Sequence, residues 1–136
     1  MNLENQTLIR NRLNLLEKMG FSCQVVTTKL TEELSAEELN FTSDKVTLEV
    51  SFETFVNCKK VSIYISRNDK NASFSFVEYI SFKKDEAHLD GGLDEPDDIY
   101  INRFFDIFQK SINTELLDVL KGDMWLDVPK DYGIYK

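Results

Sequence analysis

The sequence predicts an α+β domain in which an antiparallel β-meander of about four strands packs against an N-terminal helix and a long, Phe-rich C-terminal helix. Three observations predict this class. Apolar and polar residues alternate through much of residues 45–82, helical periodicity marks a segment near each end of the chain, and the connections within residues 45–82 are short and rich in turn residues. A period of two is typical of strands with one buried face, and a period of 3.6 is typical of amphipathic helices.

The meander is predicted from three alternating runs. In residues 46–53 every second residue is apolar. The pattern recurs at Val61, Ile63 and Ile65, and again at Phe74, Phe76, Ile80 and Phe82, where Glu78 interrupts it. The connections at residues 57–60 and 67–71 carry Asn, Asp and Lys, which favour tight turns between antiparallel strands. We therefore expect the third strand to run through to Phe82.

A helix is expected from Leu3 or Glu4 to Met19, because apolar residues recur there at three- and four-residue spacing. Gly20 should end it in the left-handed conformation. Residues 21–28 are β-branched and aromatic, so a strand follows directly. Residues 29–44 are expected to form a linker with a short helix over Ser35–Leu39, since Ser35 and Glu38 have the spacing of a capping box.

The second long helix is expected to begin at Asp97 or Asp98 as its cap and to end at Gly122, with a break or kink at residues 113–114. Its apolar stripe is wide and aromatic, so this helix should cover the sheet. The last segment, residues 123–136, is short, aromatic and interrupted by Pro129 and Gly133. Trp125 and Leu126 in this tail either close the core or remain free for a partner.

Length and composition predict one domain in residues 1–136. The chain has 136 residues, of which 42% are hydrophobic, and no low-complexity linker divides it. It lacks a signal-peptide pattern and any apolar run of the length that spans a bilayer, so we expect a cytoplasmic protein. In a reducing compartment Cys23 and Cys58 should be unpaired, small and at least half-buried.

Formal charge is concentrated in one segment. Residues 1–84 contain 11 acidic and 11 basic side chains, and residues 99–136 contain 6 acidic and 5 basic ones. Residues 85–98, which we call the acidic segment, contain seven acids and no Lys or Arg. Nearly all of the net charge of −8 therefore comes from these residues.

Three interpretations of the acidic segment stay open at this level. It is a solvated loop, a docking surface for a basic protein, or a calcium site made from Asp90, Asp94, Asp97 and Asp98. An acidic surface speeds encounter with a positive partner and fixes the register of the complex. The calcium interpretation lacks the spacing and the twelfth-position Glu of an EF-hand. The helix dipole accounts for acids beside the helix start, but not for Asp85, Glu86 or Asp90.

Enzymatic and nucleic-acid-binding functions are disfavoured. His88 is the only histidine, no Ser or Cys lies in a nucleophile elbow, and no glycine-rich phosphate loop is present. Two distant cysteines and one histidine do not supply a zinc site. Phosphate binding needs Lys and Arg on one face, which opposes direct binding of nucleic acid. We expect no cofactor, no metal and no membrane partner.

The chain resembles bacterial immunity proteins of contact-dependent growth inhibition and related polymorphic-toxin systems. The resemblance rests on a small acidic domain without a catalytic set, in which a leading helix runs through Lys18-Met19-Gly20-Phe21 into a strand and is followed by a β-meander and a Phe-rich helix. The resemblance implies a stoichiometric inhibitor, a monomer or weak dimer, that binds a cognate toxin domain, often a basic nuclease. The acids would take the place of a phosphate backbone, and exposed aromatic residues would anchor the complex. The partner-binding residues so predicted are Asp85, Glu86, Asp90, Asp94, Glu95, Asp97, Asp98, Trp125, Tyr132 and Tyr135.

Two other classes fit the same profile. A secretion chaperone is also small and acidic, but should show a large apolar surface for dimerisation or for its effector. A phage-encoded inhibitor that mimics nucleic acid, or another small acidic adaptor, would use the same charge. The target protein or the neighbouring gene would distinguish these from an immunity protein.

Overall fold

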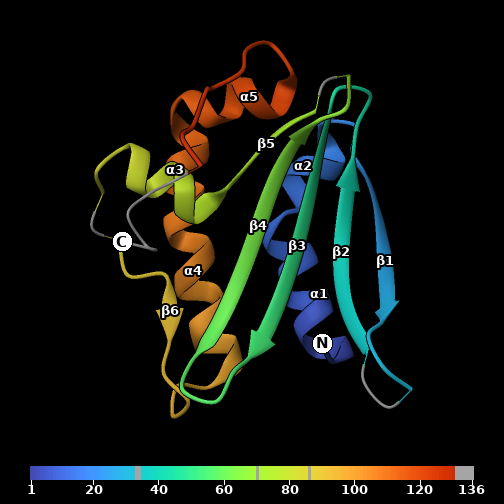
Figure 1. The fold of residues 1–136 in the computed structure, drawn as a ribbon, viewed down its shortest axis with the longest axis vertical. Helices are drawn as coiled ribbons and strands as arrows, with labels where there is room; N and C mark the ends of the chain where they lie inside the picture. Colours follow the sequence, from blue (N-terminus) through green and yellow to red (C-terminus); the bar gives the residue numbers. More distant parts are fainter. Residues whose placement is uncertain (33–34, 70, 86, 131–136) are drawn as a thin grey trace.

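The computed structural model describes residues 1–32, 35–69, 71–85 and 87–130 and has the expected α+β class (Figure 1). An antiparallel sheet in the order β1-β2-β3-β4-β5 is a continuous meander, and a short β6 pairs with the other end of the β4 edge that β5 occupies. In chain order the elements are α1 (Leu3–Arg12), α2 (Asn14–Lys18), β1 (Ser22–Lys29), β2 (Ser35–Thr42), β3 (Val46–Thr54), β4 (Lys59–Arg67), β5 (Ala72–Ser75), α3 (Phe76–Phe82), β6 (Asp90–Gly91), α4 (Asp97–Ser111), a π-helical turn η1 (Ile112–Leu116) and α5 (Leu117–Lys121).

The sheet has one apolar face, and the core lies on it. Along β3 and β4 the buried residues alternate with partly exposed ones, as the period-two pattern predicts. Leu48 pairs with Ile65, and Val50 pairs with Ile63, so the same face of both strands is apolar. The opposite face is polar, and Tyr64 on it is 50% exposed. In the described part of the chain the core is therefore shared between one side of the sheet and the helices.

Helix α4 supplies four of the ten buried aromatic side chains of the described core. Tyr100, Phe104, Phe105 and Phe108 are all buried at 1% exposure or less. The Phe76 ring on α3 packs edge-on against Phe108, with 4.9 Å between ring centroids. The predicted break at residues 113–114 is confirmed, because Thr114 has non-helical backbone angles inside η1. The predicted end at Gly122 is also confirmed, with a φ of +77°.

The prediction of a single strand through Phe82 is wrong in its second half. The strand ends at Ser75, and the chain turns directly into α3. The Ser75 hydroxyl accepts a hydrogen bond from the Glu78 N–H at 3.1 Å, and the Glu78 carboxylate accepts one from the Ser75 N–H at 2.6 Å. This capping box starts the helix. Phe76, Tyr79 and Ile80 then bury one helical face.

The linker predicted over residues 29–44 is also wrong. Half of it is β2, which pairs with β1 along all eight of its residues and with β3 along part of them. Leu39 and Phe41, two residues apart, are both buried, so the burial follows a strand period. The leading helix differs in a smaller way, since it breaks at Leu13 into α1 and α2 before Gly20 ends it with a φ of +101°.

Cys23 and Cys58 are both free and half-buried, as expected. Within the described residues, no helix combines the length and apolar character needed to cross a membrane.

The capping box gives a stability prediction. We expect Ser75→Ala to lower the free energy of unfolding by about 0.5–2 kcal/mol, because α3 loses the acceptor for its Glu78 N–H. Ser81→Ala in the same helix is the control, since Ser81 is exposed and no side-chain hydrogen bond involves it in the described structure. Urea unfolding checks both variants. Equal stabilities for the two would show that the box does not fix the start of α3.

Candidate functional site at the acidic segment

The acidic segment lies beside α4. After α3 the chain passes through β6, where Asp90 pairs with Lys60 and Gly91 with Lys59 on β4. A turn closed by a hydrogen bond from the Glu95 N–H to the Gly92 carbonyl at 3.2 Å then leads into the first turn of α4. The segment therefore runs back along α4 toward its N-terminus (Figure 1).

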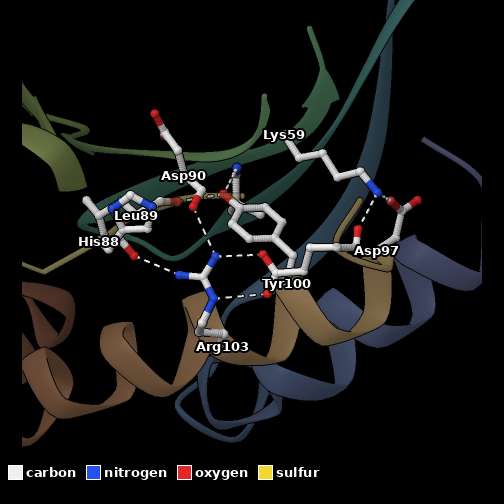
Figure 2. A network of polar contacts seen from close by, with 9 residues as sticks. Lys59, His88, Leu89, Asp90, Asp97, Tyr100 and Arg103 are labelled. Atoms are coloured by element: carbon white, nitrogen blue, oxygen red, sulfur yellow. Dashed lines mark hydrogen bonds and ion pairs between the residues drawn. The ribbon is translucent and has the colours of Figure 1, made fainter. Parts of the chain in front are cut away.

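Arg103 on α4 holds the segment at three points (Figure 2). Its guanidinium donates two hydrogen bonds to the Glu95 carboxylate, at 2.8 and 3.1 Å. It also donates to the backbone carbonyls of His88 at 2.9 Å and Asp90 at 3.0 Å. The hydrogen bonds from Arg103 lower the pKa of Glu95, so this carboxylate stays ionised. Glu95 is thus an internal partner of Arg103.

Asp97 is bound by a second cation. Lys59 is only 9% exposed, and its ammonium donates to the Asp97 carboxylate and to the Glu95 carbonyl, both at 2.6 Å. The buried amide of Asn5 donates to the other Asp97 oxygen at 3.1 Å. The hydrogen bond from Lys59 lowers the pKa of Asp97. Asp97 therefore ties together α1, β4 and α4.

The predicted role of Asp97 or Asp98 as helix cap is wrong. The N-cap position of α4 is Pro96, and no side-chain hydrogen bond caps the helix. Asp97 is instead the first helical residue, and its carboxylate is directed to Lys59 and Asn5. An acid in the first turn is still favoured by the helix dipole.

Tyr100 on α4 also holds the acidic segment in place. Its ring is fully buried, and its hydroxyl donates to the Leu89 carbonyl at 2.7 Å and accepts from the Val61 N–H at 2.8 Å. Burial raises its pKa to about 12. The ring lies so close to Gly91 that a Cβ there would approach Tyr100 Cδ1 to 2.7 Å. One side chain thus joins β4, the acidic segment and α4.

Four described acids of the segment have no ion-pair partner among the described residues. They are Asp85, Asp90, Asp94 and Asp98. Asp90 is half-buried and the other three are exposed. Figure 2 shows the Asp90 carboxylate turned away from Arg103, which contacts only the Asp90 backbone.

The structure does not bring all four together. Asp85 lines a cleft of about 640 Å³ with Lys83 and, from α4, Lys110, whereas Asp98 lies in the first turn of that helix. Lys110 and Asp98 are about 18–20 Å apart along α4, at a rise of 1.5 Å per residue. Asp85 is therefore separate from Asp90, Asp94 and Asp98, which lie between β6 and the first turn of α4.

The predicted anchor Trp125 is not at this site. Trp125 is half-buried against the core, with its ring centroid 5.1 Å from that of Phe74 and 5.7 Å from the Arg67 guanidinium carbon. Arg67 and Lys59 are at opposite ends of β4, so Trp125 lies far from the acidic segment. Glu86, Tyr132 and Tyr135 lie outside the described residues.

Exposed apolar side chains are present beside the acids instead. Phe55 and Val56, in the β3–β4 hairpin turn, are 46% and 97% exposed, and Leu93 and Ile99 are 47% and 54% exposed. β6 pairs with Lys59 and Lys60, the first residues of β4 after this hairpin, so the turn at residues 92–95 begins at the hairpin end of β4, and Figure 1 shows both turns at the same end of the sheet. We call this surface, formed by Phe55, Val56, Leu93, Asp94, Asp98 and Ile99, the acidic end.

The calcium interpretation finds no support in the geometry, because Asp97 is committed to Lys59 and Asn5. No group of three or more His, Cys, Asp or Glu side chains in the described residues could hold a metal ion. Arg103, Lys59 and Tyr100 were not among the predicted site residues. Their contacts join positions up to 39 residues apart, and no local pattern in the sequence marks them.

No protein-family model, curated protein or solved structure matches the chain in comparisons of its sequence and fold.

The Tyr100 hydroxyl gives one prediction. Tyr100→Phe removes the acceptor of the Val61 N–H and the donor to Leu89, and should cost about 1–3 kcal/mol of stability because buried polar groups lose their partners. Tyr64→Phe on the exposed sheet face is the control, with an expected change within about 0.5 kcal/mol. Denaturant unfolding measures both. A Tyr100→Phe protein as stable as the control would contradict this role.

The Asp97–Lys59 pair gives a pH-dependent prediction. Because the folded pKa of Asp97 lies below its unfolded value, its contribution is complete above about pH 4 and is lost as the pH falls through the folded pKa. We therefore expect Asp97→Asn to be less stable than the wild type at pH 7, with the difference shrinking toward pH 3. Its neighbour Asp98→Asn should differ from the wild type by only a few tenths of a kcal/mol at pH 7. Urea unfolding across pH tests this, and a constant Asp97→Asn deficit would refute it.

Proposed function

We propose that the chain is a binding module for a basic protein, and that it acts as an immunity protein against a cognate, nuclease-type toxin domain. One observation carries the proposal. The backbone of the acidic segment is fixed by Arg103, Lys59 and Tyr100, while the carboxylates of Asp90, Asp94 and Asp98 have no partner in the described structure.

Fixed, unpaired carboxylates suit a cationic partner. A protein that binds nucleic acid has Lys and Arg arranged for phosphate, and an acidic surface steers such a partner into place. Because Arg103 already holds the segment, binding needs little further ordering of the backbone, which lowers its entropic cost. Glu95 and Asp97, which are used internally, are left out of the proposed contact.

The acidic end also has the composition of an interface centre. Binding energy in protein complexes is concentrated in apolar and aromatic anchors surrounded by polar residues. Phe55 and Val56 protrude at the hairpin and Leu93 and Ile99 flank the acids, so these four replace Trp125 as the proposed anchors. Exposed apolar residues gathered beside charge are a feature of binding surfaces.

The proposal predicts a charge effect on association. Asp90→Asn, Asp94→Asn and Asp98→Asn together should slow association with the toxin domain encoded beside the gene by on the order of tenfold at low salt, because steering is lost. The difference should shrink at high salt, where charges are screened. Stopped-flow mixing measures the rate.

The matched control removes three acids elsewhere. Asp44, Asp118 and Asp127 are exposed, and no ion pair in the described structure involves them. Their triple Asn variant has the same net charge as the first triple variant, and it should associate almost as fast as the wild type. Equal slowing of association in both triple variants would show that only the net charge matters and not the position of the acids. A neighbour-encoded toxin domain that forms no complex at all would reject the immunity function.

A further inference from the structure

Strand β1 is an open edge of the sheet. It pairs with β2 over its whole length, Ser22–Lys29, and no described element pairs with its other side (Figure 1). The opposite edge differs, because it consists of the short strands β5 and β6, of four and two residues, and the Tyr100 hydroxyl binds the Val61 N–H of β4 between them. An open edge presents backbone N–H and C=O groups that only another extended chain can satisfy fully.

The strand alternation identifies these groups. Ser43 donates its N–H to the Val46 carbonyl on β3. The backbone N–H and C=O groups of Ser43 and of the odd-numbered residues of β2 therefore point toward β3. The backbone groups of the even-numbered residues of β2 point toward β1, where they pair with those of Ser22, Gln24, Val26 and Thr28. The backbone groups of the remaining residues of β1 point outward. These residues are Cys23, Val25, Thr27 and Lys29.

This edge lacks the features that usually prevent strand addition. Isolated monomers protect long edges with proline, bulges or inward-pointing charges. β1 contains no proline, its pairing with β2 is continuous, and its one charged residue is Lys29 at the end. Val25, near the middle, is 51% exposed. The edge is therefore long, regular and open.

We propose that a second copy of this chain adds to β1 as an antiparallel strand, about a two-fold axis at Val26, and joins the two sheets into one. In this register Val25 lies opposite Thr27 of the second copy, and Cys23 lies opposite Lys29 of the second copy. Every outward N–H and C=O of the four outward residues then has a partner. The directions of the side chains agree with this register, because the side chains of directly paired residues point to the same face of the joined sheet.

Charge favours a second copy as the occupant. The Cys23 thiol lies near the Arg10–Glu17 ion pair, in which Glu17 remains partly exposed. In the proposed register, Lys29 of the second copy lies opposite Cys23 and beside this pair, where its ammonium shares the Glu17 carboxylate with Arg10, and symmetry repeats the contact. The acidic segment pairs with β4, three strands away from β1, or about 14 Å at 4.8 Å per strand. The bulk of the negative charge therefore does not oppose the association.

This dimer is independent of the proposed function. It leaves the acidic end open in both copies, and it is held by backbone hydrogen bonds and not by a large apolar surface.

The substitution Thr27→Pro tests the proposed contact between the two β1 strands. Thr27→Pro removes an N–H that points away from β2, so the bonds between β1 and β2 remain. Thr27→Val retains the N–H and the side-chain shape, and is the control. Sedimentation equilibrium from micromolar to millimolar concentration should show dimers for the wild type and Thr27→Val, and at least tenfold weaker association for Thr27→Pro. A wild type that stays monomeric, or a dimer that Thr27→Pro leaves unchanged, would overturn the proposal.

Cross-linking gives a second readout that needs no proline. In a Cys23→Ser, Cys58→Ser background, Val26→Cys places two thiols across a non-hydrogen-bonded pair, where Cα atoms are about 4.5 Å apart and a disulfide fits. Oxidation should yield a covalent dimer. Gln24→Cys in the same background should not, because its symmetry mate lies four residues along the partner strand. Equal cross-linking of both variants, or of neither, would exclude this register.

Discussion

The path of the acidic segment depends on two cations from neighbouring elements, Arg103 and Lys59. Seven acids in fourteen residues repel one another, so the segment would not keep a defined course unless some of this charge were neutralised. Arg103 binds Glu95 and two carbonyls of the segment, and Lys59 binds Asp97 where α4 begins. A buried ammonium is costly unless it is paired and hydrogen-bonded, and both of the Lys59 contacts meet that need.

This arrangement divides the acids into two kinds. Glu95 and Asp97 attach the segment to the fold, whereas Asp90, Asp94 and Asp98 remain available at its surface. The exposed apolar side chains of Phe55, Val56, Leu93 and Ile99 add contact area beside that charge.

The sequence predicted the sheet, the two helical segments, the kink at residues 113–114 and the ends at Gly20 and Gly122, because each rests on a periodic or a conformational constraint. The two errors in strand assignment share one cause. Ser-x-x-Glu occurs at residues 35–38 and at residues 75–78. Only the second begins a helix, because Phe76, Tyr79 and Ile80 follow at helical spacing, whereas Leu39 and Phe41 follow at strand spacing. Periodicity therefore decides where a capping pattern is used.

The sequence predicted where the acids are concentrated but not which contacts they make. The charge count identified the segment, yet no local pattern shows that Arg103 reaches back to Glu95 or that Lys59 reaches Asp97. Those contacts depend on how β4 and α4 meet in the folded chain, which a single sequence does not display. Trp125 was predicted at the interface by residue type alone, and its packing on Phe74 follows from where the chain turns after Gly122.

The central claim, that the free protein holds its acidic segment in one conformation, is tested most directly by ¹⁵N relaxation of the backbone amides in residues 88–98. Attachment by Arg103, Lys59 and Tyr100 predicts order parameters of about 0.85 there, equal to those of β4. Values below about 0.6 in the absence of a partner would contradict it, because they would show a segment that takes its shape only on binding.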